Sequence, residues 1–292
     1  MDAARRPGRS RHDRPGFNAV VLAGERKRNS ALPGKFHVPI KALIPVCGRP
    51  MLQRVLDSLL ASRFVMQVFL CSPEMSEFAE MPGLSQAISS GRISWVRNEQ
   101  TPSRSALKAL EQAGGGAPVL LTTADHALLT AEMVDFFCSA ALNAPEDLLV
   151  GLARLDIIRK AFPDVRRTFY RFRGGCYSSC NLFGFMSRKA FRAAGFWQEI
   201  EQERKHPARI ISRFGWTWAA RYLAGRLGLE QAFIRASAVL GCNAGPVIMP
   251  FPEAAIDVDT LEDWQLAEKI IEARCQKQHP SGGRQCSGCS AL

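Results

Sequence analysis

Apolar runs of strand length alternate with amphipathic segments through the first half of the chain. Five runs are mostly apolar, at 18–23, 65–71, 93–97, 118–125 and 147–154. Three intervening segments, at 50–62, 103–113 and 130–142, repeat apolar residues with the period of an α-helix, and Thr130 stands at the expected N-cap of the third. Continuous apolar strands separated by helices are typical of a parallel sheet that helices cover on both faces.

The pattern changes after about residue 155. Segments 166–175 and 181–187 predict two strands of a hairpin or an added sheet, and 188–205 and 206–229 predict helices. The chain then returns to a short strand at 246–251, an extended segment at 255–260 and a helix at 261–274. We therefore predict an α/β domain over 18–275, with an insertion or subdomain at 155–240 that completes the acceptor side of a cleft.

Composition adds a strong positive charge to this picture. The chain has 292 residues, is 47% hydrophobic and carries a formal net charge of +11. A basic protein attracts polyanions, which include nucleotides, phosphate esters, nucleic acid and anionic membranes. The basic residues are scattered and form no recognised nucleic-acid module, so we expect no nucleic-acid partner. No apolar run approaches the roughly 20 residues of a membrane span.

The two ends of the chain are poor in core-forming residues. We expect 1–17 to be a disordered basic arm and 276–292 to be a flexible tail. The nine cysteines lie mostly in apolar surroundings and no secretory signal is evident, which favours reduced thiols and a cytoplasmic location. Cys286 and Cys289 form a CxxC in the tail, but a second ligand pair with zinc-site spacing is missing.

Three polar features fall where ligands of such a sheet bind, beyond the carboxyl ends of its strands. A basic loop follows the first strand, and an aspartate, Asp125, ends the strand at 118–125. Asp257 and Asp259 lie on one face of the extended segment near the C-terminus. Each also has a plain structural interpretation: a solvated loop, a turn or N-cap aspartate, and a helix cap. The loop's basic residues are Arg26, Lys27, Arg28, Lys35 and Lys41.

These motifs together carry a family resemblance. The sequence "VVLAG…KALIPVCGRPMLQRVLDSL", followed by "VLLTTADHALLT" and "IDVDTLEDW", resembles the MobA-like nucleotidyltransferase superfamily over roughly 18–150 and 245–275. The resemblance implies a Rossmann-like three-layer sandwich with a mainly parallel sheet. It also implies transfer of a nucleoside monophosphate from a triphosphate to a phosphorylated small-molecule acceptor, with Mg²⁺ as cofactor and pyrophosphate as the second product.

The resemblance also implies a role for individual residues. Asp125 matches the metal-binding aspartate, and Asp257 or Asp259 matches a second acidic metal position. Lys41 matches the lysine that contacts phosphate, which makes it a catalytic candidate together with Asp125. The nucleotide-binding candidates are Leu22, Ala23, Gly24, Arg26, Arg28, Lys41 and Ser103. The loop departs from the family pattern because it is longer and poorer in glycine, and Arg26 or Arg28 then takes the place of the phosphate arginine.

The remaining predictions concern the acceptor site and two alternative functions. We expect the segment 155–240 to bind the acceptor, with Arg171 and Asn181 as candidates among its arginine, serine and asparagine side chains. One alternative is a glycosyltransferase of related fold, because "DVD" spells a DxD motif for a nucleotide sugar. Another is a non-catalytic protein that contacts a membrane surface through the basic and aromatic segment 213–229; a packed helix with arginines at its edge is the simpler interpretation of this segment.

Overall fold

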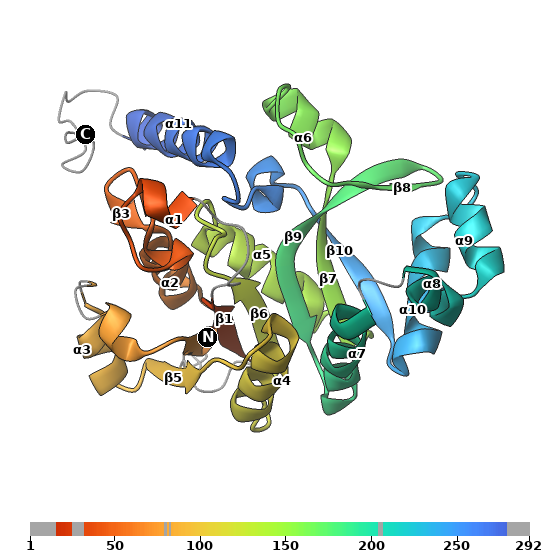
Figure 1. Cartoon of the computed structure of the whole chain (residues 1–292), viewed down its shortest axis with the longest axis horizontal. Helices are drawn as coiled ribbons and strands as arrows, with labels where there is room; N and C mark the ends of the chain where they lie inside the picture. Colours follow the sequence, from red (N-terminus) through yellow and green to blue (C-terminus); the bar gives the residue numbers. More distant parts are fainter. Residues whose placement is uncertain (1–15, 25–31, 79–80, 82, 204–206, 279–292) are drawn as a thin grey trace, which may run out of the picture.

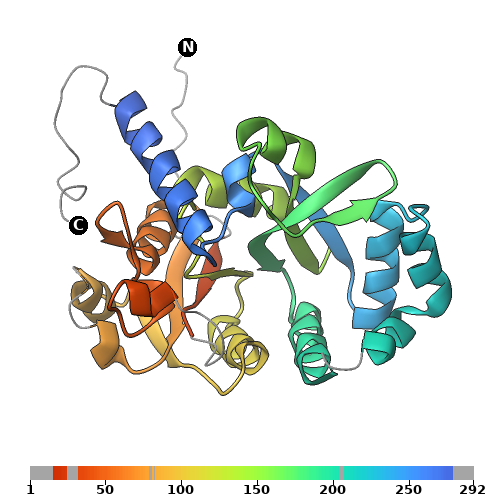
Figure 2. The same ribbon diagram turned by 45° about the horizontal axis from the view of Figure 1, so that its top comes forward.

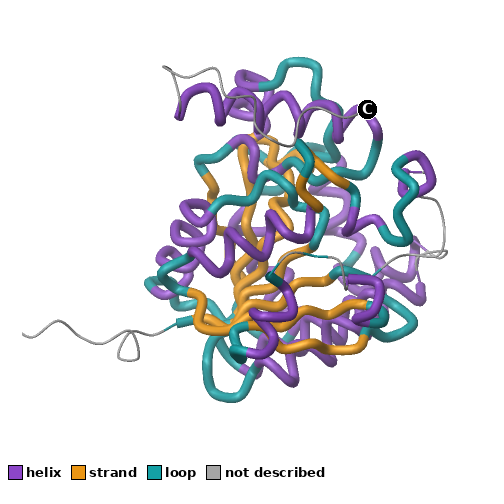
Figure 3. The backbone as a smooth tube through the Cα atoms, turned by 90° about the vertical axis from the view of Figure 1, so that its left-hand side faces the viewer, coloured by secondary structure: helices purple, strands orange, loops and turns teal. Residues whose placement is uncertain are grey.

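A computed structural model describes residues 16–24, 32–78, 81, 83–203 and 207–278. Its strands form one layer with helices on both sides, as Figure 3 shows. Figure 1 shows the same sheet running across the molecule, with α2, α4, α5 and α7 beside it. The predicted α/β three-layer architecture with a mainly parallel sheet is confirmed.

Seven strands lie side by side in the order β10-β7-β9-β6-β1-β4-β5. The pairs β1–β4, β1–β6, β4–β5 and β7–β10 are parallel. The strands are β1 (Phe17–Leu22), β4 (Val65–Ser72), β5 (Ile93–Arg97), β6 (Val119–Thr123), β7 (Leu148–Arg154), β9 (Gly175–Phe185) and β10 (Ala244–Met249). A separate two-stranded sheet pairs β2 (Pro45–Val46) with β3 (Arg49–Pro50). All five strands predicted in the first half are present.

The strand β9 is the antiparallel member of the main sheet. It lies between β6 and β7 and is antiparallel to both. Its N-terminal part also pairs with β8 (Tyr170–Phe172), so the predicted hairpin is present. Part of the segment 155–240 therefore sits inside the main sheet, and the rest forms helices at its end. The first strand begins at Phe17, the last residue of the predicted arm.

Two apolar clusters fill the two faces of the sheet. One face packs against α2 (Met51–Ala61) and α5 (Ala131–Leu142). The other packs against α4 (Pro102–Ala113), α7 (Phe191–Glu203) and α10 (Leu229–Leu240). The hydroxyl of Thr130 accepts a hydrogen bond from the Met133 amide (3.2 Å), as predicted for the N-cap of α5. The alternation of side chains along each strand decides which cluster each residue joins.

A third apolar cluster brings the end of the chain back to its beginning. The last helix, α11 (Leu261–Gln278), lies beside the segment 32–47, where Ile270 and Ile271 pack near Ile44 and Val46. The Trp264 indole nitrogen donates to the Pro45 carbonyl oxygen over 2.7 Å. Figure 2 shows α11 in blue next to the red and orange start of the chain. This packing fixes the C-terminal segment at the carboxyl edge of the sheet.

The remaining elements are short. They are α1 (Leu32–Lys35), α3 (Leu84–Ser89), α6 (Leu155–Ala161), α8 (Pro207–Phe214), α9 (Trp216–Leu223), and the 3-10 helices η2 (Lys41–Leu43), η3 (Met75–Phe78), η4 (Arg188–Ala190) and η5 (Pro252–Ala255). Two helices, α8 and α9, replace the continuous helix predicted at 206–229, because Gly215 adopts a φ of 91° between them. Within the described ranges, no helix has both the length and the hydrophobicity needed to cross a bilayer. The cytoplasmic location stays a prediction.

Candidate active site

The carboxyl ends of β1 and β6 meet at one edge of the sheet. Leu22 at the end of β1 pairs in register with Thr123 at the end of β6. The Ala124 amide continues this ladder by donating to the Leu22 carbonyl oxygen (3.0 Å). Asp125 follows directly, so the sheet itself places its carboxylate beside the start of the loop after β1. The sequence predicted this juxtaposition.

A backbone hydrogen bond attaches the C-terminal acidic segment to the same edge. The Val258 amide donates to the Asp125 carbonyl oxygen over 3.0 Å. Asp263, in the first turn of α11, accepts hydrogen bonds from the Thr260 amide and hydroxyl (2.9 Å each). The Thr260 hydroxyl in turn accepts one from the Asp263 amide (3.2 Å). This reciprocal N-terminal cap holds the preceding residues, including Asp257 and Asp259, in one conformation.

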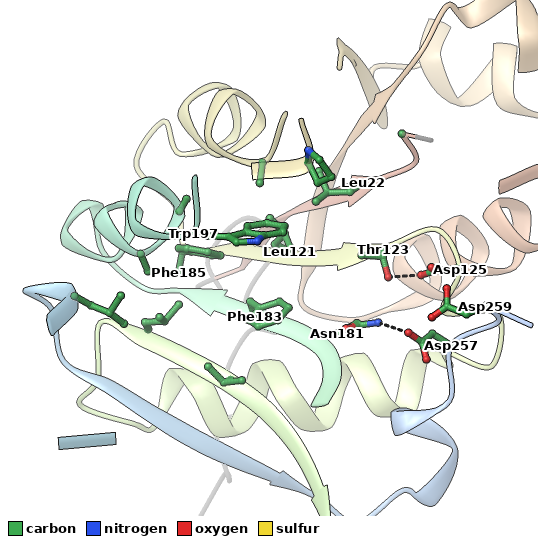
Figure 4. A pocket seen from close by; sticks show the side chains of 18 of the residues that line it. Leu22, Leu121, Thr123, Asp125, Asn181, Phe183, Phe185, Trp197, Asp257 and Asp259 are labelled. Carbon is green, nitrogen blue, oxygen red and sulfur yellow. Dashed lines mark hydrogen bonds between the residues drawn. The ribbon is translucent and has the colours of Figure 1, made fainter. Parts of the chain in front are cut away.

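Three carboxylates consequently converge from distant parts of the chain. Asp125, Asp257 and Asp259 each offer an oxygen atom within 4.8 Å of the others. The ammonium group of Lys41, from η2, pairs with Asp125 over 2.6 Å and also with Asp259. The Thr123 hydroxyl donates to the other oxygen of Asp125 (2.6 Å). Figure 4 shows these acidic side chains together at one end of a pocket.

Asp257 has different partners from the other two carboxylates. It pairs with Arg167, whose side chain is 12% exposed and also contacts Asp263 (3.4 Å). The amide nitrogen of Asn181 donates to Asp257 over 3.2 Å. Arg167 and Asn181 both belong to the segment 155–240, so this segment does take part in building the acidic cluster.

A β-bulge aims Asn181 at the cluster. Phe183 pairs with Val150 on β7, but Ser179 pairs with Leu152, so β9 uses four residues where β7 uses two. Asn181 lies in this bulge with a φ of 49°, a conformation that asparagine tolerates better than most residues. Such bulges re-aim single side chains next to functional sites. Gly151 faces the bulge, and a Cβ atom there would lie 3.1 Å from the Cβ atom of Leu182.

The charges of the cluster do not balance. Four carboxylates, of Asp125, Asp257, Asp259 and Asp263, face two paired cations, Lys41 and Arg167, so the ion-paired group has two negative charges in excess. The metal-facing set is all oxygen, which matches the preference of Mg²⁺ for carboxylate and phosphate ligands. The residues therefore fit a divalent cation, which Asp125, Asp257 and Asp259 would hold.

Burial shifts the ionisation of this site. Burial raises the pKa of the Asp125 carboxyl, but the Lys41 ammonium and hydrogen bonds from Lys41 and Thr123 outweigh it and hold the pKa below its usual value. Burial also lowers the pKa of His126 to about 4, so this buried ring is neutral near pH 7. Asp125 is thus an anion with a neutral histidine beside it in the chain.

A cavity of about 780 Å³ opens from the carboxylates along the sheet. Polar residues line one end of it: Lys41, Thr123, Asp125, Asn181, Asp257 and Asp259. Apolar residues line the rest, from Leu22 and Leu121 to Phe183, Phe185 and Trp197 (Figure 4). A cavity of this size is in the range of small-molecule sites.

The nucleotide-binding candidates are placed differently from one another. Leu22 and Gly24 line the cavity, whereas Ala23 is buried and its amide donates to the Cys71 carbonyl oxygen (2.8 Å). A Cβ atom on Gly24 would lie 3.2 Å from the side-chain nitrogen of Asn98, so the backbone is open to close approach only because residue 24 is glycine. Arg26 and Arg28 lie outside the described residues.

Ser103 and Arg171 do not line the cavity. Ser103 is buried at the start of α4, where its amide donates to Glu201 of α7 over 3.2 Å and its hydroxyl donates to the same carboxylate. Arg171 is exposed on β8. Their predicted contacts with nucleotide and acceptor stay predictions.

The segment of the membrane alternative is partly exposed. On α9, Trp216 is 61% and Leu223 is 84% exposed, and Ile234 on α10 is exposed as well. The Arg221 guanidinium lies over the Trp218 ring, 5.2 Å from its centroid. Contact of this face with a membrane stays a prediction.

Sequence reasoning missed several residues that shape the site. It treated Arg167 only as one of the arginines of 155–240 that could bind the acceptor, whereas the structure pairs it with Asp257 and Asp263. It gave no role to Thr123, Glu201 or Trp197. The "TT" before Asp125 was a signal for Thr123, because a hydroxyl two residues before a carboxylate at the end of a strand can reach that carboxylate. No local signal marks the other two.

The fold and the acidic edge define an α/β protein with a candidate site at the carboxyl ends of its strands. Residues 19–162 match the model of the MobA-like NTP transferase domain, so this part of the chain belongs to that family and the resemblance read from the motifs is confirmed. The match places residues 19–162 in the nucleotidyltransferase superfamily. Comparison with the curated proteins gives no match.

Solved structures share a similar fold over most of the chain. A hypothetical transferase from Thermus thermophilus is 28% identical, with a TM-score of 0.71 over 85% of this chain and 99% of that chain. A 4-diphosphocytidyl-2C-methyl-D-erythritol synthase from Anaerococcus prevotii is 13% identical, with a TM-score of 0.53 over 91% and 100%. A CMP:2-keto-3-deoxy-manno-octonic acid synthetase complexed with CTP is 13% identical, with a TM-score of 0.52 over 89% and 100%. The last two show the fold alone.

Proposed function

We propose that the chain is a Mg²⁺-dependent nucleotidyltransferase, which moves a nucleoside monophosphate from a nucleoside triphosphate to a phosphorylated small molecule. The observation that carries this proposal is the convergence of Asp125, Asp257 and Asp259 with Lys41 at the mouth of the cavity. The three segments are far apart in the chain, and helix capping explains only Asp263 among their carboxylates.

The reaction is a single displacement at phosphorus. An oxygen of the acceptor phosphate attacks the α-phosphorus, the bond from that atom to the pyrophosphate oxygen breaks, and pyrophosphate leaves. The protein aligns the reactants and stabilises charge, without a covalent enzyme intermediate. Bound Mg²⁺ would neutralise the negative charge of the phosphates at this position.

Residues of the chain would bind and orient the two substrates. Lys41 would exchange its carboxylate partners for a phosphate oxygen of the substrate. The backbone at Leu22, Ala23 and Gly24, with Arg26 and Arg28 in the following loop, would hold the triphosphate. Asn181 would orient Asp257 and contact the acceptor.

A screen for pyrophosphate release tests this function. The four common nucleoside triphosphates are combined with a panel of phosphorylated acceptors in the presence of Mg²⁺. The Asp125→Asn variant should lower the rate of the active pair by about a hundredfold or more, because it removes a carboxylate that would hold the Mg²⁺ against the reacting phosphates. The control, Asp164→Asn, changes an exposed aspartate far along the chain and should keep the rate. An unchanged rate in Asp125→Asn would contradict the assignment.

One observation favours a second candidate. Both aspartates of the DxD motif, Asp257 and Asp259, lie in the acidic cluster. A glycosyltransferase would transfer a sugar from a nucleotide sugar and release a nucleoside diphosphate. The same panel therefore includes sugar nucleotides, and sugar transfer without pyrophosphate release would select this alternative.

A further inference from the structure

The cavity has two chemically different ends. Its carboxylates, ammonium, amide and hydroxyl groups all lie at the end next to Asp125. The far end is lined by apolar residues of three strands and three helices: Ala106, Leu121, Leu148, Val150, Phe183, Phe185, Ala193, Ala194, Trp197 and Leu240. Figure 4 shows the progression from Asp257 and Asn181 past Phe183 to Phe185 and Trp197. We call this far end the apolar trench.

Strand alternation explains why the apolar trench follows the acidic end without interruption. On β9, Asn181, Phe183 and Phe185 are two residues apart and all line the cavity. Four residues of extended strand span about 13 Å, which is the upper bound here because the bulge at Asn181 shortens the strand. The trench therefore starts at the residue that holds Asp257 and leads away from it for up to that distance.

The walls of the trench do not suit a nucleobase or a sugar. Both carry several hydrogen-bonding groups, and burying such groups without partners is costly. Among the trench residues, the Trp197 indole nitrogen is the single polar side-chain atom. Polar partners for a base lie instead near Gly24, where the half-buried Asn98 side chain approaches the backbone.

We infer that the acceptor is a phosphate monoester of an apolar alcohol, whose hydrocarbon chain lies in the apolar trench. The inference rests on the proposed function. The ester's phosphate lies at the acidic end and its oxygen forms the new bond to the α-phosphorus, as pyrophosphate leaves with the electrons of the broken bond. The product joins the nucleoside to the alcohol through a diphosphate.

A chain-length series tests the inference. The acceptors are straight-chain alkyl phosphates from ethyl to dodecyl, below the concentrations at which they form micelles, with glycerol phosphate as the polar reference. Each further methylene that enters the trench should lower KM about fourfold, the equivalent of roughly 0.8 kcal/mol per buried methylene. KM should stop falling once the alkyl chain is long enough to reach the end of the apolar trench.

Two variants probe the same series. Ala193→Trp places a large side chain into the trench from α7 and should stop the fall of KM at a shorter chain. Phe183→Gln replaces an apolar wall by a polar one of similar length and should reduce the gain per methylene. The matched control is Ala220→Trp on the exposed side of α9, which should leave the series unchanged. Circular dichroism checks that each variant folds.

The outcomes separate the inference from the proposed function. If no acceptor of either kind releases pyrophosphate, the proposed function fails. If glycerol phosphate is used and KM does not depend on alkyl chain length, the inference fails while the proposed function stands. If Ala193→Trp weakens the binding of the triphosphate alone, measured by calorimetry, the trench holds the nucleotide and the inference is overturned.

Discussion

The two faces of strand β9 have the same neighbours in the sheet but different coverings. Cys180 and Leu182 point into a filled face and are fully packed beneath α5. Asn181, Phe183 and Phe185 point into the cavity. One face thus contributes stability through close packing, and the other gives up packing to make room for a ligand. The two faces differ in the helices that cover them: α5 packs on the filled face, and α4, α7 and α10 surround the cavity.

The largest loss of stability is expected when Arg167, at the acidic end of the cavity, is replaced. Arg167→Met leaves the half-buried Asp257 and the buried Asp263 without their cation, and should lower the free energy of unfolding by about 3 kcal/mol. Urea denaturation measures this free energy of unfolding. Arg171→Met, at an exposed arginine of the same segment, should change it by less than about 0.5 kcal/mol. Equal effects of the two substitutions would show that the Arg167 pairs are not structural.

The faces themselves can be compared by truncating neighbouring residues. Leu182→Ala opens a void in the filled face and should cost about 3 kcal/mol. Phe183→Ala removes a larger side chain but only widens an existing cavity, so it should cost about 1 kcal/mol. The same denaturation experiment checks both. A larger loss for Phe183→Ala would mean that the cavity is closed in solution.

The bulge that separates the faces depends on a small residue on β7. Gly151→Ala pushes a methyl group against Leu182 and should cost about 1 to 2 kcal/mol, with lower turnover because Asn181 moves. Gly195→Ala in α7 meets open space and should be neutral or slightly stabilising. Thermal unfolding of the two variants should therefore shift in opposite directions.

A separate effect on metal affinity concerns the competition between Lys41 and a metal ion. Both use the carboxylates of Asp125 and Asp259. Lys41→Met should therefore bind Mg²⁺ about tenfold more tightly than the wild-type chain and gain more thermal stability from it, although its turnover falls. Titration followed by melting temperature measures this. Identical Mg²⁺ affinities would show that Lys41 does not occupy the cation position.

The first half of the fold was predictable because its signals are local. Apolar runs such as 118–125 and helical periods such as 50–62 each report their own conformation. The convergence of Asp125 with Asp257 and Asp259 was predictable only through the ordered motifs of the family, since their separation exceeds 130 residues.

The second half was harder to predict because its structure depends on distant partners. The strand at 181–187 was expected in a hairpin, but its place between β6 and β7 depends on the space that these two parallel strands leave. The helix α10 was not predicted, because its mixture of apolar and small residues fits several conformations. A cleft was expected from the sequence, but its apolar lining could not be predicted, since no local pattern reports which residues of β9, α4 and α7 face it.

The backbone hydrogen bond from Val258 to Asp125 has a consequence for biosynthesis. A nascent chain that has left the ribosome only as far as β10 already contains Lys41 and Asp125, yet it lacks the other two carboxylates. Its lysine and aspartate can pair, but the cation site is incomplete. The candidate cation site is therefore complete only after 257–263 has docked and α11 has covered the segment 32–47.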